Sequence, residues 1–257
     1  MLGQLADDLQ DQQTLKAKLL SASLYPAIVS LIALLIVIFL LSTVVPQVAQ
    51  VFSGNQRKLP TLTVFMLALS DFVRNHGWTV ALLLVLGWLG FHQAMKQPSL
   101  RVQFDAAFLK LPILGRLATG YNTARFASTL AMLTGAGVPI LKALQSAADT
   151  LSNQAMREDV LDALVLVREG APLAMAMGQK KRFPSLLAMF ARLGEQTGQL
   201  PVMLQRAAQQ LSADVQRRAM ALATILEPLL IVLMGGVVML IVLAVLMPIM
   251  ELNQWVK

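Results

Sequence analysis

The longest apolar segments of the chain contain no charged residue, and they constrain the fold more than any other feature. Residues 27–45 form an uncharged run of 19 between Pro26 and Pro46, and residues 228–250 form another of 23. Because a helix needs about 20 apolar residues to cross a bilayer core, both runs predict transmembrane helices. A weaker uncharged run of 14 residues, 78–91, predicts a third span that reaches residue 94.

Composition points to the same class of protein. Hydrophobic residues make up 56% of the chain and charged residues only 14%, with a mean hydropathy of +0.65. Soluble domains average about 25% charged residues, so the composition argues against both disorder and a soluble enzyme. The absence of cysteine from the sequence excludes disulfides, thiolate metal sites and cysteine nucleophiles.

The basic residues predict an orientation. With three spans, the N-terminal segment and the long segment 95–227 share one side. Lysine and arginine pairs flank the spans on that side, at 16 and 18, 96 and 101, and 217 and 218. Short flanks rich in Lys and Arg stay cytoplasmic, which predicts a cytoplasmic N-terminus and a periplasmic C-terminus. The net charge of +7 then indicates loops beside anionic lipid, and no nucleic-acid partner is expected.

The start and the end of the chain align with each other at an offset of 202 residues. Pro26 falls on Pro228 and Pro46 on Pro248, so the prolines at each end of a span coincide. A duplication is favoured. The alternative is that two unrelated spans acquired prolines at both ends by convergence. In a duplicated chain the first copy lacks most of its cytoplasmic part, because about 100 residues of helical sequence precede the second copy.

Residues 95–227 have helical periodicity and no convincing strand alternation. Proline and glycine divide them into six or seven short helices, since Pro favours the first turn of a helix and Gly the position after the last. The segment is therefore expected to form a compact helical bundle on the cytoplasmic side.

A short glycine-containing motif ends one of these helices. It comprises Gly194, Glu195, Thr197, Gly198 and Leu200, and it resembles the Gly-Glu-x-Ser/Thr-Gly-x-Leu motif of the type II secretion system F / type IV pilus PilC-like inner-membrane platform proteins. Further short matches occur in the order found in that family, at 111–116, 135–139, 167–170 and 183–184, before the spans at 25–26 and 227–228, and in the tail at 252–253.

The resemblance implies an all-α polytopic membrane protein with three transmembrane helices and a cytoplasmic six-helix-bundle domain. The expected parts are a remnant last helix of a first cytoplasmic domain (1–25), span 1 (26–48), a periplasmic loop with a short amphipathic helix (49–76), span 2 (77–94), the cytoplasmic bundle (95–227), span 3 (228–250) and a periplasmic tail (251–257). The span-entry prolines would be Pro26 and Pro228.

The function implied is a non-enzymatic platform of the bacterial inner membrane that supports pseudopilus assembly and protein export. Its expected partners are a secretion ATPase, other inner-membrane platform proteins, pseudopilins or pilins, anionic lipids and further copies of itself. The secretion branch is favoured over the pilus branch. A small membrane transporter is the alternative from another class, although the uncharged runs 27–45, 78–91 and 228–250 contain no acid or base that a proton relay would use.

Two features are candidate contact sites, and each has a structural alternative. The Glu195 carboxylate would accept backbone N–H bonds or pair with Arg192, in preference to binding a ligand or partner. The basic run of Lys180, Lys181 and Arg182 fits a solvated loop, with lipid headgroups or an acidic partner as the alternative. No catalytic residue, metal or cofactor is expected, since the sequence has no phosphate-binding loop or metal-ligand histidine spacing.

Overall fold

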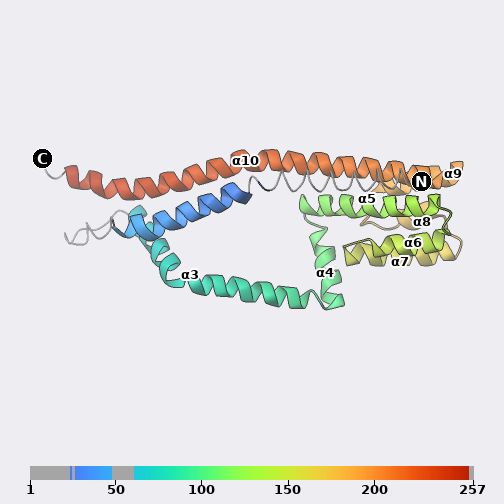
Figure 1. Cartoon of the computed structure of the whole chain (residues 1–257), viewed down its shortest axis with the longest axis horizontal. Coiled ribbons are helices and arrows are strands. Elements are labelled where there is room, and N and C mark those ends of the chain that lie inside the picture. The colour runs from blue at the N-terminus through green and yellow to red at the C-terminus, as the bar shows by residue number, and fades with distance from the viewer. Residues whose placement is uncertain (1–23, 25–26, 48–60, 255–257) are drawn as a thin grey trace. The chain divides into compact units, whose positions relative to one another are not determined.

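The computed structural model describes Leu24, residues 27–47 and residues 61–254. Every regular element within these residues is a helix, which confirms the predicted all-α class. Three helices are long and apolar enough to cross a membrane: Ala27–Gln47, α3 (Thr61–Ala94) and the apolar part of α10 (Leu200–Gln254). They contain the three predicted spans (Figure 1). The expected remnant of a first domain, apart from Leu24, lies outside the described residues.

Contacts divide the chain into two units. One comprises Met1–Gly90 and Met220–Lys257, and the other comprises Phe91–Ala219. The second unit covers most of the range for which the sequence predicts a cytoplasmic bundle, 95–227. Helices α3 and α10 each contribute residues to both units. The end of α3 and the beginning of α10 belong to the second unit, and the rest of each helix belongs to the first.

The first unit is held together by a small buried cluster and by hydroxyl groups. Leu41, Met66 and Ile241 are each at most 5% exposed and come from the three span-bearing helices. The Thr63 hydroxyl donates to the Ala244 carbonyl at 2.8 Å, and the Ser70 hydroxyl donates to the Leu41 carbonyl. These hydroxyls therefore have backbone acceptors, which a polar group needs in an apolar setting.

Helix α3 begins earlier in the chain than the predicted second span. The sequence places a loop with a short amphipathic helix at 49–76 and a separate span at 77–94. In the structure α3 runs without interruption from Thr61 to Ala94. Residues 61–70 pack against the Ala27–Gln47 helix, where π-helical η1 (Leu40–Val44) lies, and against α10. One continuous helix thus contains both expected elements in its described part.

The remaining surface of these helices is strongly apolar. Leu34, Leu84 and Val232 are 55%, 70% and 72% exposed, and many other large hydrophobic side chains on the same helices are also open. Contiguous apolar surface of this kind marks a membrane or a protein contact. It agrees with the three segments being membrane spans.

The second unit consists of the end of α3, six helices and the beginning of α10. In chain order the six are α4 (Pro98–Phe108), α5 (Leu114–Gly135), α6 (Ile140–Asp149), α7 (Gln154–Arg168), α8 (Leu173–Gly178) and α9 (Ser185–Thr197). Proline precedes α6, α8 and α9 directly, as predicted. Left-handed glycines with φ of 82°, 96° and 70° follow α5, α7 and α9 at Gly137, Gly170 and Gly198.

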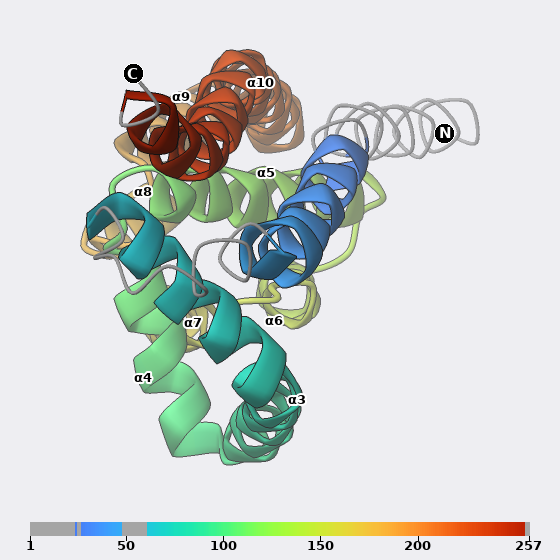
Figure 2. The same ribbon diagram turned by 90° about the vertical axis from the view of Figure 1, so that its left-hand side faces the viewer.

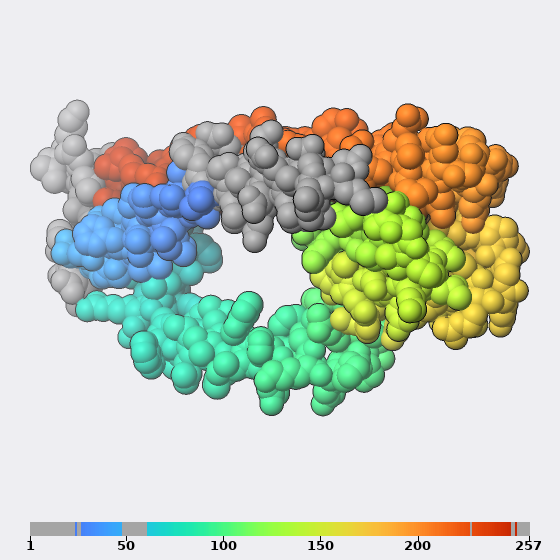
Figure 3. Space-filling view, turned by 45° about the vertical axis from the view of Figure 1, so that its right-hand side comes forward, coloured from blue at the N-terminus to red at the C-terminus, as the bar shows by residue number. Residues whose placement is uncertain are grey.

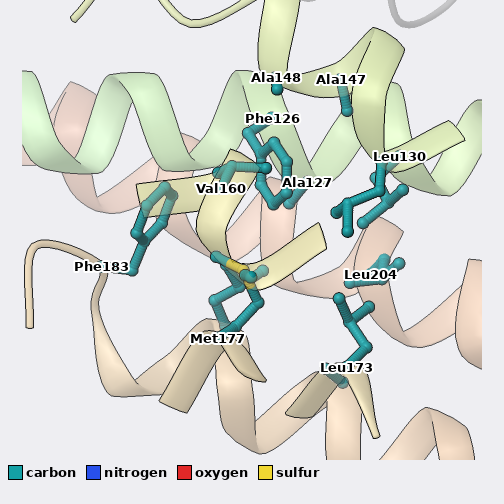
Figure 4. Packing of buried hydrophobic residues seen from close by; sticks show 14 of the residues in the cluster. Phe126, Ala127, Leu130, Ala147, Ala148, Val160, Leu173, Met177, Phe183 and Leu204 are labelled. Carbon is teal, nitrogen blue, oxygen red and sulfur yellow. The ribbon is translucent and has the colours of Figure 1, made fainter. Parts of the chain in front are cut away.

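A continuous apolar core joins these helices. Phe126 and Leu130 of α5, Val160 of α7 and Leu204 of α10 are completely buried, and Figure 4 shows their side chains pointing into the same region. The space-filling view shows the green, yellow and orange segments packed tightly against one another (Figure 3). The first turns of α10 are therefore part of the bundle, while the same helix continues into the third apolar segment.

Candidate functional site

The motif at residues 194–200 lies where three helices meet. Gly194, Glu195 and Thr197 belong to the last turn of α9, and Gly198 follows it. Leu200 is the first residue of α10 and packs against the core. The third helix is α8, whose first residues contact the motif through Glu195. We call this junction of α8, α9 and α10 the motif corner.

Glu195 caps α8. Its carboxylate accepts hydrogen bonds from the backbone N–H groups of Leu173 and Ala174, the second at 3.3 Å. Pro172 occupies the N-cap position and offers no side-chain acceptor, so the first N–H groups of α8 need one from elsewhere. A carboxylate at a helix N-terminus also complements the helix dipole. The sequence left open whether Glu195 binds backbone N–H groups or Arg192, and in the structure it binds backbone N–H groups.

The two glycines of the motif have different steric roles. A Cβ on Gly194 would lie 2.7 Å from the Leu200 Cα and 3.1 Å from the Met203 Cβ, so the glycine permits close approach of α10. Gly198 has a φ of 70°, and the Gln199 N–H returns to the Gly194 carbonyl at 2.9 Å. That bond closes a Schellman motif, which ends α9 and turns the chain into α10. The Thr197 hydroxyl donates to the Leu193 carbonyl within α9.

A second polar junction escaped the sequence analysis. Asn122 of α5 is 4% exposed, and its Oδ1 accepts from the Ser152 N–H at 3.0 Å and the Ser152 hydroxyl at 2.9 Å. Asn153 caps α7 by accepting from the Met156 N–H, and its Nδ2 donates to the Asp105 carbonyl. Asn122 thus ties α5 to the α6–α7 turn. In the sequence, the one indication of this junction is that Asn122 has an amide side chain among small and apolar residues.

The basic run is partly neutralised by α7. Lys180 pairs with Asp162 at 3.0 Å and Arg182 with Asp159 at 2.8 Å. Lys181 is exposed and lines a surface hollow of about 370 Å³. The hollow is formed by α4, α5 and the segment before α9, and its lining includes Lys110, Thr119, Lys181, Arg182 and Phe183. The run is therefore a structured edge of the bundle with a cationic hollow beside it.

Of the two span-entry prolines, Pro228 lies within the residues that the structure describes. Pro228 lies inside the continuous helix α10, well after its first residue. Proline is tolerated within membrane helices because neighbouring groups satisfy the freed carbonyl. Pro26 lies outside the described residues. Over the part of the chain that the structure describes, no three His, Asp or Glu side chains form a group able to hold a metal.

The family model described as "Type II secretion system (T2SS), protein F" matches residues 1–46 and 126–248. The two matched stretches end at Pro46 and Pro248, which lie 202 residues apart, the offset of the internal repeat. The match thus covers more than half of the chain.

Individual relatives match almost the entire chain. A type II secretion system protein F of Pseudomonas aeruginosa is 38% identical over 100% of this chain and 63% of its own length. The protein of that name from Aeromonas hydrophila is 36% identical over 100% of this chain and 66% of its own length. A type IV pilus assembly protein PilC of Thermus thermophilus is 33% identical over 98% of this chain and 62% of its own length. The chain therefore spans just under two thirds of these relatives, and it belongs to the type II secretion system protein F family.

Proposed function

We propose that this protein is a non-enzymatic, multi-pass platform component of a bacterial inner membrane that serves a type II secretion system. The proposal rests on family membership together with one structural observation. Helix α10 begins at the motif corner and continues into the third apolar segment without a break. A displacement applied to the bundle would thus reach the membrane through a continuous helix.

The motif corner suits such a role because it fixes the beginning of α10. Glu195 holds α8 against the end of α9, and Gly194 lets α10 approach α9 closely. Leu204 then inserts into the core of the bundle. We expect a cytoplasmic secretion ATPase to act on the bundle, and pseudopilins and other platform proteins to contact the spans. Copies of the chain are expected to associate, and anionic lipids to contact its basic edge.

The role is tested by deleting the gene in a strain with no other copy and restoring it on a plasmid. We expect the deletion to stop exoprotein secretion, and the wild-type gene to restore it. Full secretion in the deletion strain would contradict the proposal. A matched pair of complementing genes, Gly194→Ala and Gly178→Ala, tests the motif corner, because a Cβ fits only at Gly178. Only the Gly194 variant should complement poorly.

The basic edge is tested at Lys181, the exposed member of its run. We expect Lys181→Glu to weaken secretion if an anionic partner docks beside the hollow, because the change reverses one of the cations lining it. Arg168→Glu is the control, since Arg168 is also exposed but lies at the end of α7. Equal secretion by the two variants would indicate that the edge is only solvated.

The alternative function is assembly of a type IV pilus, because relatives named for that process match nearly as much of the chain. The secretion-named relatives of Pseudomonas and Aeromonas are more similar, at 38% and 36% identity against 33% and 31%. Loss of surface pili with normal secretion in the deletion strain would favour the pilus role. Solute transport by the purified protein in liposomes would favour the transporter alternative.

A further inference from the structure

Helix α4 carries an apolar stripe that the second unit leaves partly exposed. Leu100, Phe104 and Phe108 follow one another at spacings of four residues, which places them on one side of α4, and Leu111 lies three residues beyond the end of the helix. Leu100 and Phe104 are each 43% exposed, and Leu111 is 44% exposed. No residue of α4 is fully buried. Large apolar side chains in a row on a helix surface require an apolar partner.

The stripe lies at the end of an apolar span. The Phe104 ring contacts the Phe91 ring edge-on at a centroid distance of 5.1 Å, and Phe91 is the last residue of the uncharged run 78–91. Three residues separate the end of α3 from the beginning of α4, and Figure 2 shows α4 following the end of α3. Phe104 is therefore held beside the last residue of that uncharged run.

A neighbouring side of α4, about 100° from Phe104 around the helix, is attached to the bundle. The Asp105 carboxylate accepts the Gln154 N–H at 2.7 Å, and the Asp105 carbonyl accepts from the Asn153 amide at 3.2 Å. Both partners belong to the beginning of α7. Asp105 is the only acidic residue in α4, so the one negative charge of the helix is directed toward the bundle and away from the stripe.

Cations flank the stripe. Arg101 falls beside Phe104 on α4, and Lys110 lies two residues beyond the end of the helix, directly before Leu111. Lys110 also lines the cationic hollow with Lys181 and Arg182. Long basic side chains can keep their charges at headgroup level while their stems cover apolar surface. An apolar stripe between cations, on a helix directly after a span, is typical of a helix that lies in a membrane interface.

We infer that α4 lies in the bilayer interface, with its stripe at the headgroup–acyl boundary and with Arg101 and Lys110 among anionic headgroups. The occupant of the stripe is lipid, since the contact with Phe91 keeps the helix at the membrane boundary. The bundle is then attached to the membrane along α4 as well as by its two span-bearing helices. This inference depends on α3 being a span and not on the proposed role in secretion.

The test uses the full chain in vesicles of phosphatidylcholine and phosphatidylglycerol. Because the sequence contains no cysteine, single cysteines at Leu100 and Leu111 can carry a fluorescent nitrobenzoxadiazole label without other changes. Leu84, 70% exposed in the span, is the lipid control, and Met175, 55% exposed on α8, is the water control. We expect nitroxide lipids to quench both α4 labels at least threefold more strongly than the Met175 label.

Labels on α4 that respond like the Met175 label would place the stripe in water and overturn the inference. Labels shielded from both nitroxide lipid and aqueous iodide would mean that protein covers the stripe, and would overturn it too. If nitroxide lipids do not quench the Leu84 label, α3 does not cross the membrane there, and the inference is overturned. None of these outcomes depends on secretion, so they can be separated from failure of the proposed function.

A charge-reversal pair tests the cations. Arg101→Glu with Lys110→Glu is expected to lower lipid quenching at Leu100 at least twofold in vesicles containing phosphatidylglycerol, because two anions then face anionic headgroups. Lys142→Glu with Arg168→Glu makes the same change in charge at exposed positions on α6 and α7 and should leave quenching unchanged. Equal loss of quenching in both pairs would contradict a specific headgroup contact by α4.

Discussion

Gly194 stands at the closest approach between α9 and α10. An added methyl group would lie 2.7 Å from the Leu200 Cα, and backbone cannot move aside as a flexible side chain can. We expect Gly194→Ala to destabilise the bundle by about 2 kcal/mol, the order of magnitude for overpacking a core. The measurement is the midpoint of thermal unfolding by circular dichroism in detergent, which should fall by several degrees.

Gly178 provides the matched control, since a Cβ there would lie 3.7 Å from the Ala188 Cβ, an ordinary contact. Gly178→Ala should leave the unfolding midpoint unchanged or raise it slightly, because alanine is the better helix former. Equal destabilisation by the two substitutions would show that the close approach at Gly194 does not decide the packing of α10.

Glu195 contributes through hydrogen bonds from two backbone N–H groups. Glu195→Ala removes the acceptor for the first turn of α8, and loss of a helix cap typically costs about 1 kcal/mol. We expect faster amide hydrogen exchange in α8, measured by mass spectrometry on peptides covering 171–178. Glu158→Ala, at an exposed position within α7, is the control and should leave α8 exchange unchanged. Unchanged exchange in the Glu195 variant would contradict the capping role.

At the scale of elements, the α6–α7 turn depends on Asn122. Asn122→Leu keeps a similar side-chain volume but removes the acceptor for the Ser152 N–H and hydroxyl. Unpaired polar groups in buried surroundings cost about 1–3 kcal/mol, so we expect the turn to open more often and its amides to exchange faster. Hydrogen exchange over 150–156 measures the effect.

The control on the same helix is Thr129→Val, which removes a hydroxyl that donates only one turn back, to the Arg125 carbonyl. It should not alter exchange at the α6–α7 turn. Faster exchange there in both variants would mean that α5 as a whole had loosened, and would contradict a specific role for Asn122.

Helix limits in the bundle were predictable because proline and glycine act locally. Pro139, Pro172 and Pro184 each precede a helix, and Gly137 and Gly170 adopt positive φ after one. The hydrogen-bonded junctions were not predictable from spacing, because their partners are far apart in sequence. The Asn122–Ser152 bond spans 30 residues and the Glu195–Leu173 bond spans 22. Periodicity gives an element and its ends, whereas these contacts exist only after the elements have packed.

The beginning of α3 shows the same limit inside the apolar unit. The sequence places residues 61–70 in a periplasmic loop together with Arg57, Lys58 and Arg74. Within this segment Thr63 and Ser70 carry hydroxyl groups. Both hydroxyls are buried and donate to carbonyls of the other two span-bearing helices. A polar side chain that finds a backbone acceptor on a neighbouring helix fits an apolar environment, and hydropathy along one chain cannot register that partner.

At the scale of the whole molecule, three spans would place the two ends of the chain on opposite sides of the membrane, and the basic flanks predict which side each end takes. With the cytoplasmic N-terminus that the basic flanks predict, we expect residues 95–227 to lie in the cytoplasm and Lys257 in the periplasm. We expect alkaline phosphatase, which folds only outside the cytoplasm, to be active when fused after Gly54 or Lys257 and inactive after Gln97. Enzyme activity in intact cells, normalised to the amount of fusion protein, is the measurement.

The fusion after Gly54 separates two ways in which this prediction could fail. If α3 does not cross, the fusions after Gly54 and Gln97 are both active and the one after Lys257 is inactive. If the orientation is reversed, the fusion after Gly54 is inactive and the one after Gln97 is active. The α3 helix is the element at issue, because its apolar window has a mean hydropathy of only 1.3 against 3.1 and 3.2 for the others. With a basic flank of Lys96 and Arg101 directly after it, we expect that window to cross toward the cytoplasm.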